Sequence, residues 1–169
     1  GKMSKSRGNV IDPLKMCDKY GTDATRLSLV IGTTPGNDMN LSEIKIAGYR
    51  NFVNKFWNIS RYVISYFDNF KNLEGSRIDS KGDYSLADKW ILNKMKELIT
   101  DVTDDLDNYH FSQAGERLRE FTWGELADWY LEVSKFERTT YKGVVLRTIL
   151  DDLLRLWHPF VPFITEVIS

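Results

Sequence analysis

Apolar residues recur along the chain at steps of three and four positions, the spacing of an amphipathic α-helix. The longest such stretch is expected to follow Asn40, and three more are expected at about 86–106, 112–136 and 142–157. No segment alternates with the period of two that a half-buried strand requires. The pattern therefore predicts an all-α fold, an antiparallel helix bundle.

Polar residues and glycines mark the expected helix ends. Asp12 followed by Pro13 predicts a cap and the first position of a short helix, which stops at Gly21. Thr22 or Asp23 is expected to cap a second short segment. These two short elements would precede the bundle.

The bundle helices are expected to have caps of their own. Asn40, with Glu43 three positions later, fits a capping box, and Ser85 is placed to cap the second long helix. Between them, the Gly- and Ser-containing stretch 69–84 predicts a connector. The expected core face of the third helix comprises Ala114, Leu118, Phe121, Trp129 and Val133.

The charges are unevenly distributed, although the net charge is only −1. Residues 1–71 hold 11 Lys and Arg against 6 Asp and Glu, whereas residues 72–169 hold 12 against 18. Such asymmetry favours contact with a polyanion at one end, the alternative being chance clustering on solvated faces. A composition with 42% hydrophobic and 28% charged residues is typical of a globular domain.

Several kinds of chemistry are excluded by what the sequence lacks. Cys17 is the only cysteine, so no internal disulfide can form, and no long apolar run is present. A cytoplasmic protein without a membrane segment is therefore expected. One predicted helix carries Asp101, Asp104, Asp105 and Asp107. With no His or Cys nearby, these aspartates are expected to form a solvated acidic face, and no metal site is predicted.

The segment Lys2-Met3-Ser4-Lys5-Ser6 can hold a polyphosphate. Its two ammonium groups can contact one polyphosphate while Ser4 and Ser6 donate hydrogen bonds to phosphate oxygens. A cationic loop that stabilises the growing charge of a leaving pyrophosphate favours the transition state over the ground state. A solvated basic tail is the alternative interpretation.

A second group of polar residues lies on the long helix. Asn51, Lys55, Asn58 and Tyr62 are spaced so that they form one stripe, about 120° from the apolar face. Amides can read base edges, a ring can stack on an unpaired base, and a lysine can hold phosphate. The alternative is an ordinary polar helix face.

Both groups, with the residues around them, resemble the class I aminoacyl-tRNA synthetases. The pentamer Lys2 to Ser6 is similar to their signature loop, and the following residues resemble the valyl, isoleucyl and leucyl branch. The stretches that carry this resemblance are 8–13, 18–27, 48–62, 123–135 and 158–166. The segments 40–43 and 48–62 favour the valyl enzymes.

The resemblance implies roles for individual residues of the loop. In this family the second lysine, Lys5 here, contacts ATP and stabilises the transition state of adenylate formation, while Lys2 assists. Ser4 and Ser6 are expected to join them in binding ATP, which Mg²⁺ accompanies. Arg7 stands where most relatives carry an apolar residue.

The resemblance also implies a tRNA site on the long helix. Residues at the positions of Lys55, Asn58 and Tyr62 approach the valine anticodon in valyl enzymes, and Asn51 extends the same stripe. Tyr62 replaces a Phe of relatives, which preserves stacking. An arginine used by some relatives falls on Ile44, so that contact is not expected here.

As a whole, the resemblance implies a piece of an enzyme that activates valine with ATP and transfers it to tRNA-Val. Residues 1–40 would form the ATP loop and a stem-contact region, and residues 41–169 the helical anticodon-binding domain. The nucleotide-binding fold is absent, so the chain alone is expected to be inactive and to hold no cofactor. It is expected to be a monomer. Two alternatives stay open: a fragment of an isoleucyl or leucyl enzyme, and a non-catalytic helical module that binds RNA or protein.

Overall fold

The computed structural model describes residues 11–32, 42–69, 78, 81–137 and 139–169, and every regular element within them is helical. The predicted all-α helix bundle is thereby confirmed. Its elements are α1 (Pro13–Tyr20), α2 (Thr22–Val30), α3 (Glu43–Asp68), α4 (Leu86–Asp107), α5 (Phe111–Glu120), a π-helical stretch η3 (Phe121–Tyr130), α6 (Leu131–Ser134), α7 (Thr140–Trp157) and α8 (Pro162–Ile168).

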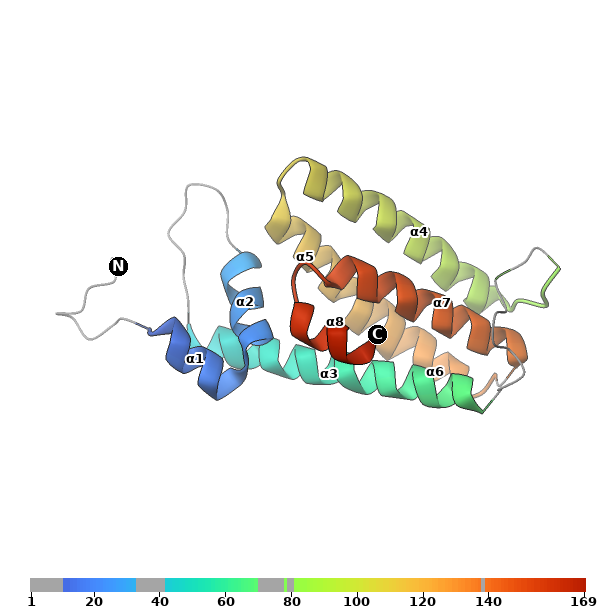
Figure 1. Ribbon diagram of the computed structural model, residues 1–169. Helices are drawn as coiled ribbons and strands as arrows, with labels where there is room; N and C mark the ends of the chain where they lie inside the picture. The colour runs from blue at the N-terminus through green and yellow to red at the C-terminus, as the bar shows by residue number, and fades with distance from the viewer. Residues whose placement is uncertain (1–10, 33–41, 70–77, 79–80, 138) are drawn as a thin grey trace.

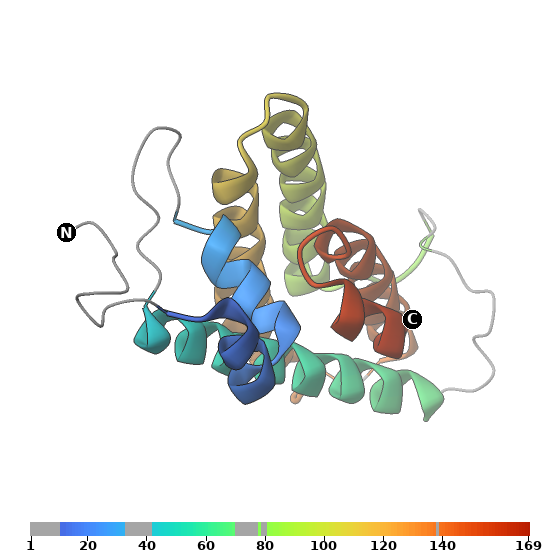
Figure 2. The ribbon, with the colours of Figure 1, turned by 60° about the vertical axis from the view of Figure 1, so that its left-hand side comes forward.

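Four long rods run antiparallel to form the bundle: α3, α4, the continuous rod α5–η3–α6, and α7 (Figure 1). The α5–η3–α6 rod and α7 each contact both α3 and α4, so α3 and α4 lie across the bundle from each other. The short helices α1 and α2 pack beside the first half of α3, and α8 covers α3 and α7 (Figure 2).

Trp157, at the end of α7, lies at the centre of the core and is fully buried. Its ring lies 5.1 Å from that of Phe52, 6.1 Å from that of Phe56 and 5.9 Å from that of Phe160. Its indole N–H donates to Thr122 Oγ1 at 3.0 Å, so the polar atom of this large apolar side chain is satisfied. The core therefore joins α3, η3 and α7 at one point.

The predicted start and stop of α1 are confirmed. Asp12 accepts a hydrogen bond from the N–H of Leu14 at 3.0 Å, Pro13 is the first helical residue, and Gly21 follows with a φ of 90°. Only glycine adopts such a φ without strain. Because Gly21 also precedes α2 directly, the expectation that Thr22 or Asp23 caps this helix was wrong.

Asp23 caps a different helix instead. Its buried carboxylate accepts from the N–H of Phe163 at 3.4 Å and of Ile164 at 2.8 Å, in the first turn of α8. These are unpaired backbone donors of a helix N-terminus, where a negative charge is stabilising. The start and the end of the chain are thus joined by a cap that spans about 140 residues of sequence.

The predicted cap of the long helix α3 was wrong, whereas that of α4 is confirmed. Ser42 accepts from the N–H of Lys45 at 3.2 Å and α3 begins at Glu43, while Asn40 lies outside the described residues. Glu43 bonds instead to Lys19 and, at 2.7 Å, to the hydroxyl of Tyr20, which ties α1 to α3. Ser85 forms a complete capping box with Asp88.

The third rod departs from the predicted helical period. A regular α-helix would direct Trp129 to the core, but this side chain is 47% exposed and Tyr130 is buried in its place. The cause is η3, because a π-helix bonds residue i to i+5 and each of its turns holds more residues than an α-helical turn. After Phe121, the residues that face the core are therefore Leu126 and Tyr130, each one position later than an α-helical period would place it.

Candidate nucleic-acid interface

The predicted ATP loop lies outside the part of the chain that the structure describes. Lys2, Ser4, Lys5 and Ser6 all fall in 1–10, so their expected roles stay predictions. The described residues hold no group of three or more His, Cys, Asp or Glu that could bind a metal ion. Within the same residues, no helix combines the length and the apolar character needed to cross a bilayer.

The structure places the predicted stripe of α3 along one side of a single straight helix. Asn51 and Asn58 are exposed to solvent, whereas Lys55 and Tyr62 are half-buried. The two amides are therefore free to meet a ligand directly. The lysine and the tyrosine, by contrast, are held by contacts with the α5–η3–α6 rod.

Lys55 is held by two residues of η3. Its Nζ lies 2.7 Å from Asp128 Oδ1 and 3.9 Å from the centroid of the Trp123 ring. An ammonium over an indole face is attracted by the ring quadrupole, so both contacts orient the charge. Lys55 thus reaches the surface in a defined position, with part of its charge balanced by Asp128.

Sequence reasoning missed Trp123 and Asp128 as partners of Lys55. They are five positions apart, the separation that a π-helix hydrogen bond spans, and η3 brings them to the same lysine. An α-helical period would put them on different faces. The available signal was Asp128, the one charged residue in the apolar stretch 126–131.

Tyr62 marks the other end of the stripe. Its hydroxyl lies 3.3 Å from Ser134 Oγ of α6, and its ring lies 6.2 Å from that of Tyr66 at an interplanar angle of 45°. Because Ser134 is buried, the hydroxyl points inward, while the residue as a whole remains partly exposed. The ring is therefore fixed rather than free to swing.

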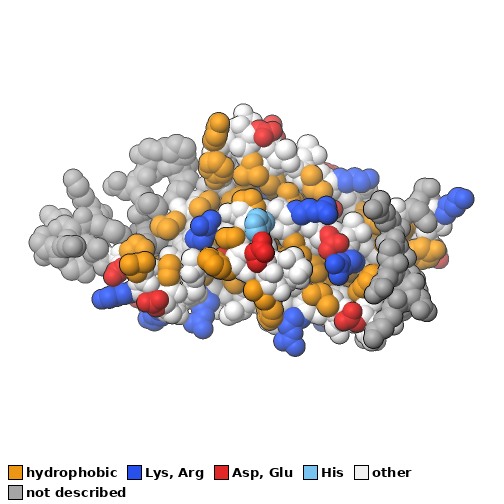
Figure 3. Space-filling view, viewed as in Figure 1, with side chains coloured by type: hydrophobic (Ala, Val, Ile, Leu, Met, Phe, Trp, Pro, Cys, Tyr) orange, Lys and Arg blue, Asp and Glu red, His pale blue; other side chains and the backbone are white. Residues whose placement is uncertain are grey.

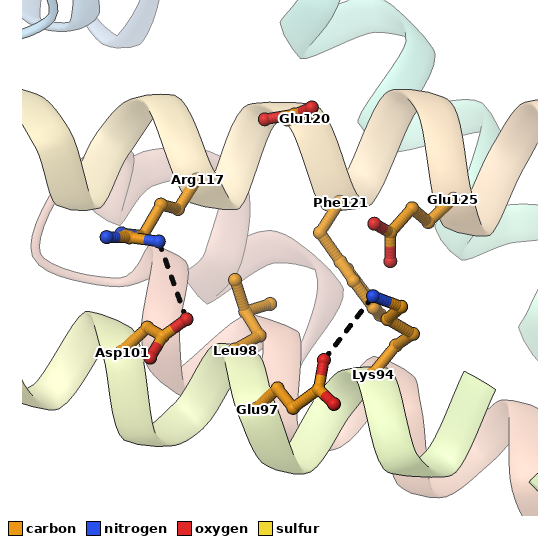
Figure 4. A pocket seen from close by; sticks show the side chains of 8 residues that line it. All are labelled: Lys94, Glu97, Leu98, Asp101, Arg117, Glu120, Phe121 and Glu125. Carbon is orange, nitrogen blue, oxygen red and sulfur yellow. Dashed lines mark hydrogen bonds and ion pairs between the residues drawn. The ribbon is translucent and has the colours of Figure 1, made fainter. Parts of the chain in front are cut away.

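On its side toward α4, the α5–η3–α6 rod forms an acidic groove (Figure 4). Arg117 of α5 pairs with Asp101 at 3.4 Å and with Asp105 at 2.8 Å. Asp105 is buried, so the expectation that all four aspartates of this region are solvated was wrong for it. Burial raises the pKa of Glu125, which also lines the groove. A phosphate would meet repulsion here.

The face formed by α7 and α8 carries basic and acidic side chains interspersed with apolar ones (Figure 3). The i,i+4 pair Arg147–Asp151, at 3.0 Å, is one example. His158 Nδ1 lies 2.8 Å from Thr165 Oγ1, which links the end of α7 to α8. Mixed charges of this kind do not provide a continuous basic surface for a polyanion.

Two family models match the chain. Residues 1–42 match "tRNA synthetases class I (I, L, M and V)", and residues 88–169 match "Anticodon-binding domain of tRNA ligase". Helix α3 lies between the two matched ranges. A valine–tRNA ligase from Clostridium tetani is 46% identical over 174 residues, and one from Dehalococcoides mccartyi is 44% identical over 170. These alignments cover 99% and 98% of the chain. The chain belongs to the class I aminoacyl-tRNA synthetases, on their valyl branch.

This synthetase chain spans about a fifth of the length of the curated relatives it matches, 19% for both enzymes named above. A valine–tRNA ligase from Geobacter sulfurreducens gives the same picture, with 46% identity over 180 residues. A solved structure titled as a ternary complex of Agrobacterium radiobacter LeuRS, tRNA and LeuAMS covers 99% of the chain with a TM-score of 0.78 and 25% identity. The helical arrangement described above thus recurs in a synthetase chain five times as long.

Proposed function

We propose that the chain is a segment of a valine–tRNA ligase, which activates valine with ATP and transfers it to tRNA-Val. The observation that carries this proposal is the 44–46% identity to valine–tRNA ligases over nearly the whole chain. The enzyme would act as a monomer in the cytoplasm, with ATP as its Mg²⁺ complex.

In this proposal, residues 1–40 contribute to ATP chemistry. Lys2 and Lys5 neutralise the charge that develops on pyrophosphate as it leaves, and Ser4 and Ser6 hold phosphate oxygens by hydrogen bonds. Because the chain spans about a fifth of its relatives, it is expected to lack activity alone. ATP–pyrophosphate exchange by the purified chain would contradict this.

Residues 41–169 contribute to tRNA binding, with the anticodon read along α3. The exposed amides of Asn51 and Asn58 can donate to and accept from base edges, and the ring of Tyr62 can stack on an unpaired base. Lys55, oriented by Asp128 and Trp123, can contact phosphate or a base acceptor without first being ordered. Preorganisation of this kind lowers the entropy lost on binding.

A binding titration tests the anticodon role. The chain is titrated with tRNA-Val and with the same tRNA carrying a changed anticodon, at several salt concentrations. Tyr62→Ala and Lys55→Ala are expected to reduce the preference for the unchanged anticodon about tenfold, the effect of losing one stacked base or one specific contact. Lys96→Ala, which removes an exposed charge from α4, is the control.

The outcome also separates the proposal from a non-catalytic interaction module. Equal, weak binding of both tRNAs, unaffected by Tyr62→Ala and Lys55→Ala, would exclude anticodon reading. A preference for the isoleucine or leucine anticodon would assign the chain to another branch of the family.

A further inference from the structure

A groove separates the first turns of α3 from the junction of α5 and η3, on the opposite side of the α5–η3–α6 rod from the acidic groove. Its volume is about 470 Å³, within the range of small-ligand pockets. It is lined by Lys45, Gly48, Tyr49, Asn51, Phe52, Arg119 and Trp123.

The residues that line this groove combine three aromatic rings, two cations and one amide, with no carboxylate among them. Trp123 is 37% exposed, and its ring lies 6.2 Å from the Phe52 ring at an interplanar angle of 22°, with Lys55 Nζ 3.9 Å from its centroid. The aromatic surface that Lys55 leaves exposed can serve as a platform on which an unpaired base stacks. The lining therefore suits a flat, polar, anionic ligand.

The two cations of the groove remain available to a phosphate. Lys45 Nζ donates to the carbonyl of Ile31 at 2.6 Å. Because a carbonyl is neutral, this contact does not balance the positive charge of Lys45. Arg119 pairs with Glu116 at 3.1 Å, but both side chains are well exposed, and such pairs contribute little stability. A phosphate can thus replace Glu116 as the partner of Arg119 at small cost.

Tyr49 keeps its proton in this setting. Burial, together with the charge of Glu116, raises the pKa of Tyr49 to about 12, although Arg119 opposes the shift. The phenol is therefore neutral at physiological pH and adds no charge that would repel a phosphate. Arg119 lies 6.0 Å from the centroid of the Tyr49 ring, so cation and ring border the same space.

We propose that this groove binds one unpaired nucleotide of the tRNA anticodon loop, adjacent to the bases read along α3. The proposal rests on the tRNA-binding function above, and it extends the tRNA-binding surface from α3 to residues of α5 and η3. Asn51 belongs both to the groove and to the α3 stripe, so a nucleotide in the groove continues the same RNA path. Only single-stranded loop nucleotides can be splayed out in this way.

Filling the groove tests the proposal without disturbing the fold. A Cβ at Gly48 meets no atom within 4 Å, so Gly48→Leu directs a side chain into open groove space. Gly124→Leu makes the same change at a helical glycine that is equally open and does not line the groove. The two variants should unfold at similar urea concentrations.

The measurement uses tRNA-Val anticodon stem-loops in which each loop base in turn is 2-aminopurine. We expect the fluorescence of 2-aminopurine at one loop position to be quenched when the stem-loop binds the chain. Gly48→Leu is expected to abolish that quenching and to weaken affinity about tenfold, whereas Gly124→Leu should change neither. Arg119→Gln is expected to lower the slope of log affinity against log salt by about one.

The outcomes separate this proposal from the one it rests on. If Lys55→Ala weakens anticodon-dependent binding but Gly48→Leu and Arg119→Gln leave affinity, quenching and salt slope unchanged, the groove proposal is wrong and the tRNA function stands. If the chain binds no stem-loop, both are wrong. If polyglutamate competes equally and Gly48→Leu blocks it, the groove is a site for acidic peptide instead.

Discussion

Lys142 Nζ lies 2.7 Å from Asp88 Oδ1, and both side chains are buried, with exposed fractions of 0% and 1%. The hydroxyl of Tyr130 donates to the same Asp88 oxygen at 2.6 Å, and the N–H of Ser85 donates to the other at 3.0 Å. Glu137 Oε2 lies 3.1 Å from Lys142 Nζ. This buried cluster joins α4, η3 and α7 at the end of the bundle where α4 begins.

Removing Lys142 from this cluster is expected to destabilise the chain strongly. Lys142→Met leaves Asp88 buried without its cation, and an uncompensated buried charge costs about 3–5 kcal/mol of unfolding free energy. Urea denaturation measures the loss. Lys135→Met removes a lysine from an exposed pair with Glu132 and should cost less than about 1 kcal/mol. Equal effects of the two variants would show that the buried pair is not a stabilising element.

The cluster also predicts how stability depends on pH. Burial raises the pKa of Asp88, but hydrogen bonds from Lys142, Tyr130 and Ser85 and the charge of Lys142 outweigh it, so the pKa is lowered overall. A carboxylate with a lowered folded-state pKa stabilises the chain above its unfolded pKa of about 4, and this contribution is lost as the pH falls through the folded value. The stability difference between wild type and Asp88→Asn should therefore be constant from pH 7 to 5 and shrink below about pH 4. Urea denaturation across that range tests it, and a constant difference down to pH 2 would contradict it.

Gly115 is expected to set the distance between α5 and the end of α2. A Cβ at this position would lie 2.7 Å from Cγ1 of the buried Ile31, so Gly115→Ala forces the two helices apart, with a cost of about 1–3 kcal/mol. Gly124→Ala meets no atom within 4 Å and should stabilise by about 0.5–1 kcal/mol, because it lowers the entropy of the unfolded chain. Thermal unfolding measures both, and a stabilising Gly115→Ala would show that α2 is loosely packed.

Asp128 is expected to increase the selectivity of Lys55 for the valine anticodon by fixing the position of its ammonium group. Asp128→Asn removes the carboxylate 2.7 Å from Lys55 Nζ, so the ammonium gains charge and loses orientation. Affinity for any tRNA should rise severalfold at low salt, while the preference for the valine anticodon falls. Asp107→Asn, an exposed residue at the end of α4, is the charge-matched control. An unchanged preference in Asp128→Asn would mean that the ion pair has no part in reading.

Local chemistry in the sequence determined much of this fold. The caps at Asp12 and Ser85, the glycine stop at Gly21 and the three-to-four spacing of apolar residues depend on hydrogen bonds and faces within about one helical turn. Such features are visible in a short window of residues. The family resemblance followed from the same kind of contiguous pattern, and the comparisons with known proteins confirm it.

What only the tertiary structure decided depends on residues far apart in the chain. Asp23 caps α8 rather than its own helix because folding brings two chain segments about 140 positions apart together. Tyr130 replaces Trp129 in the core because Asp88 and Lys142, from two other helices, hold its hydroxyl and ring, and the π-helical turns of η3 place it there. The helical spacing of apolar residues carries no information about such partners. The π-helical turns and the contact with a distant carboxylate both depend on how the helices pack, not on neighbouring residues in the sequence.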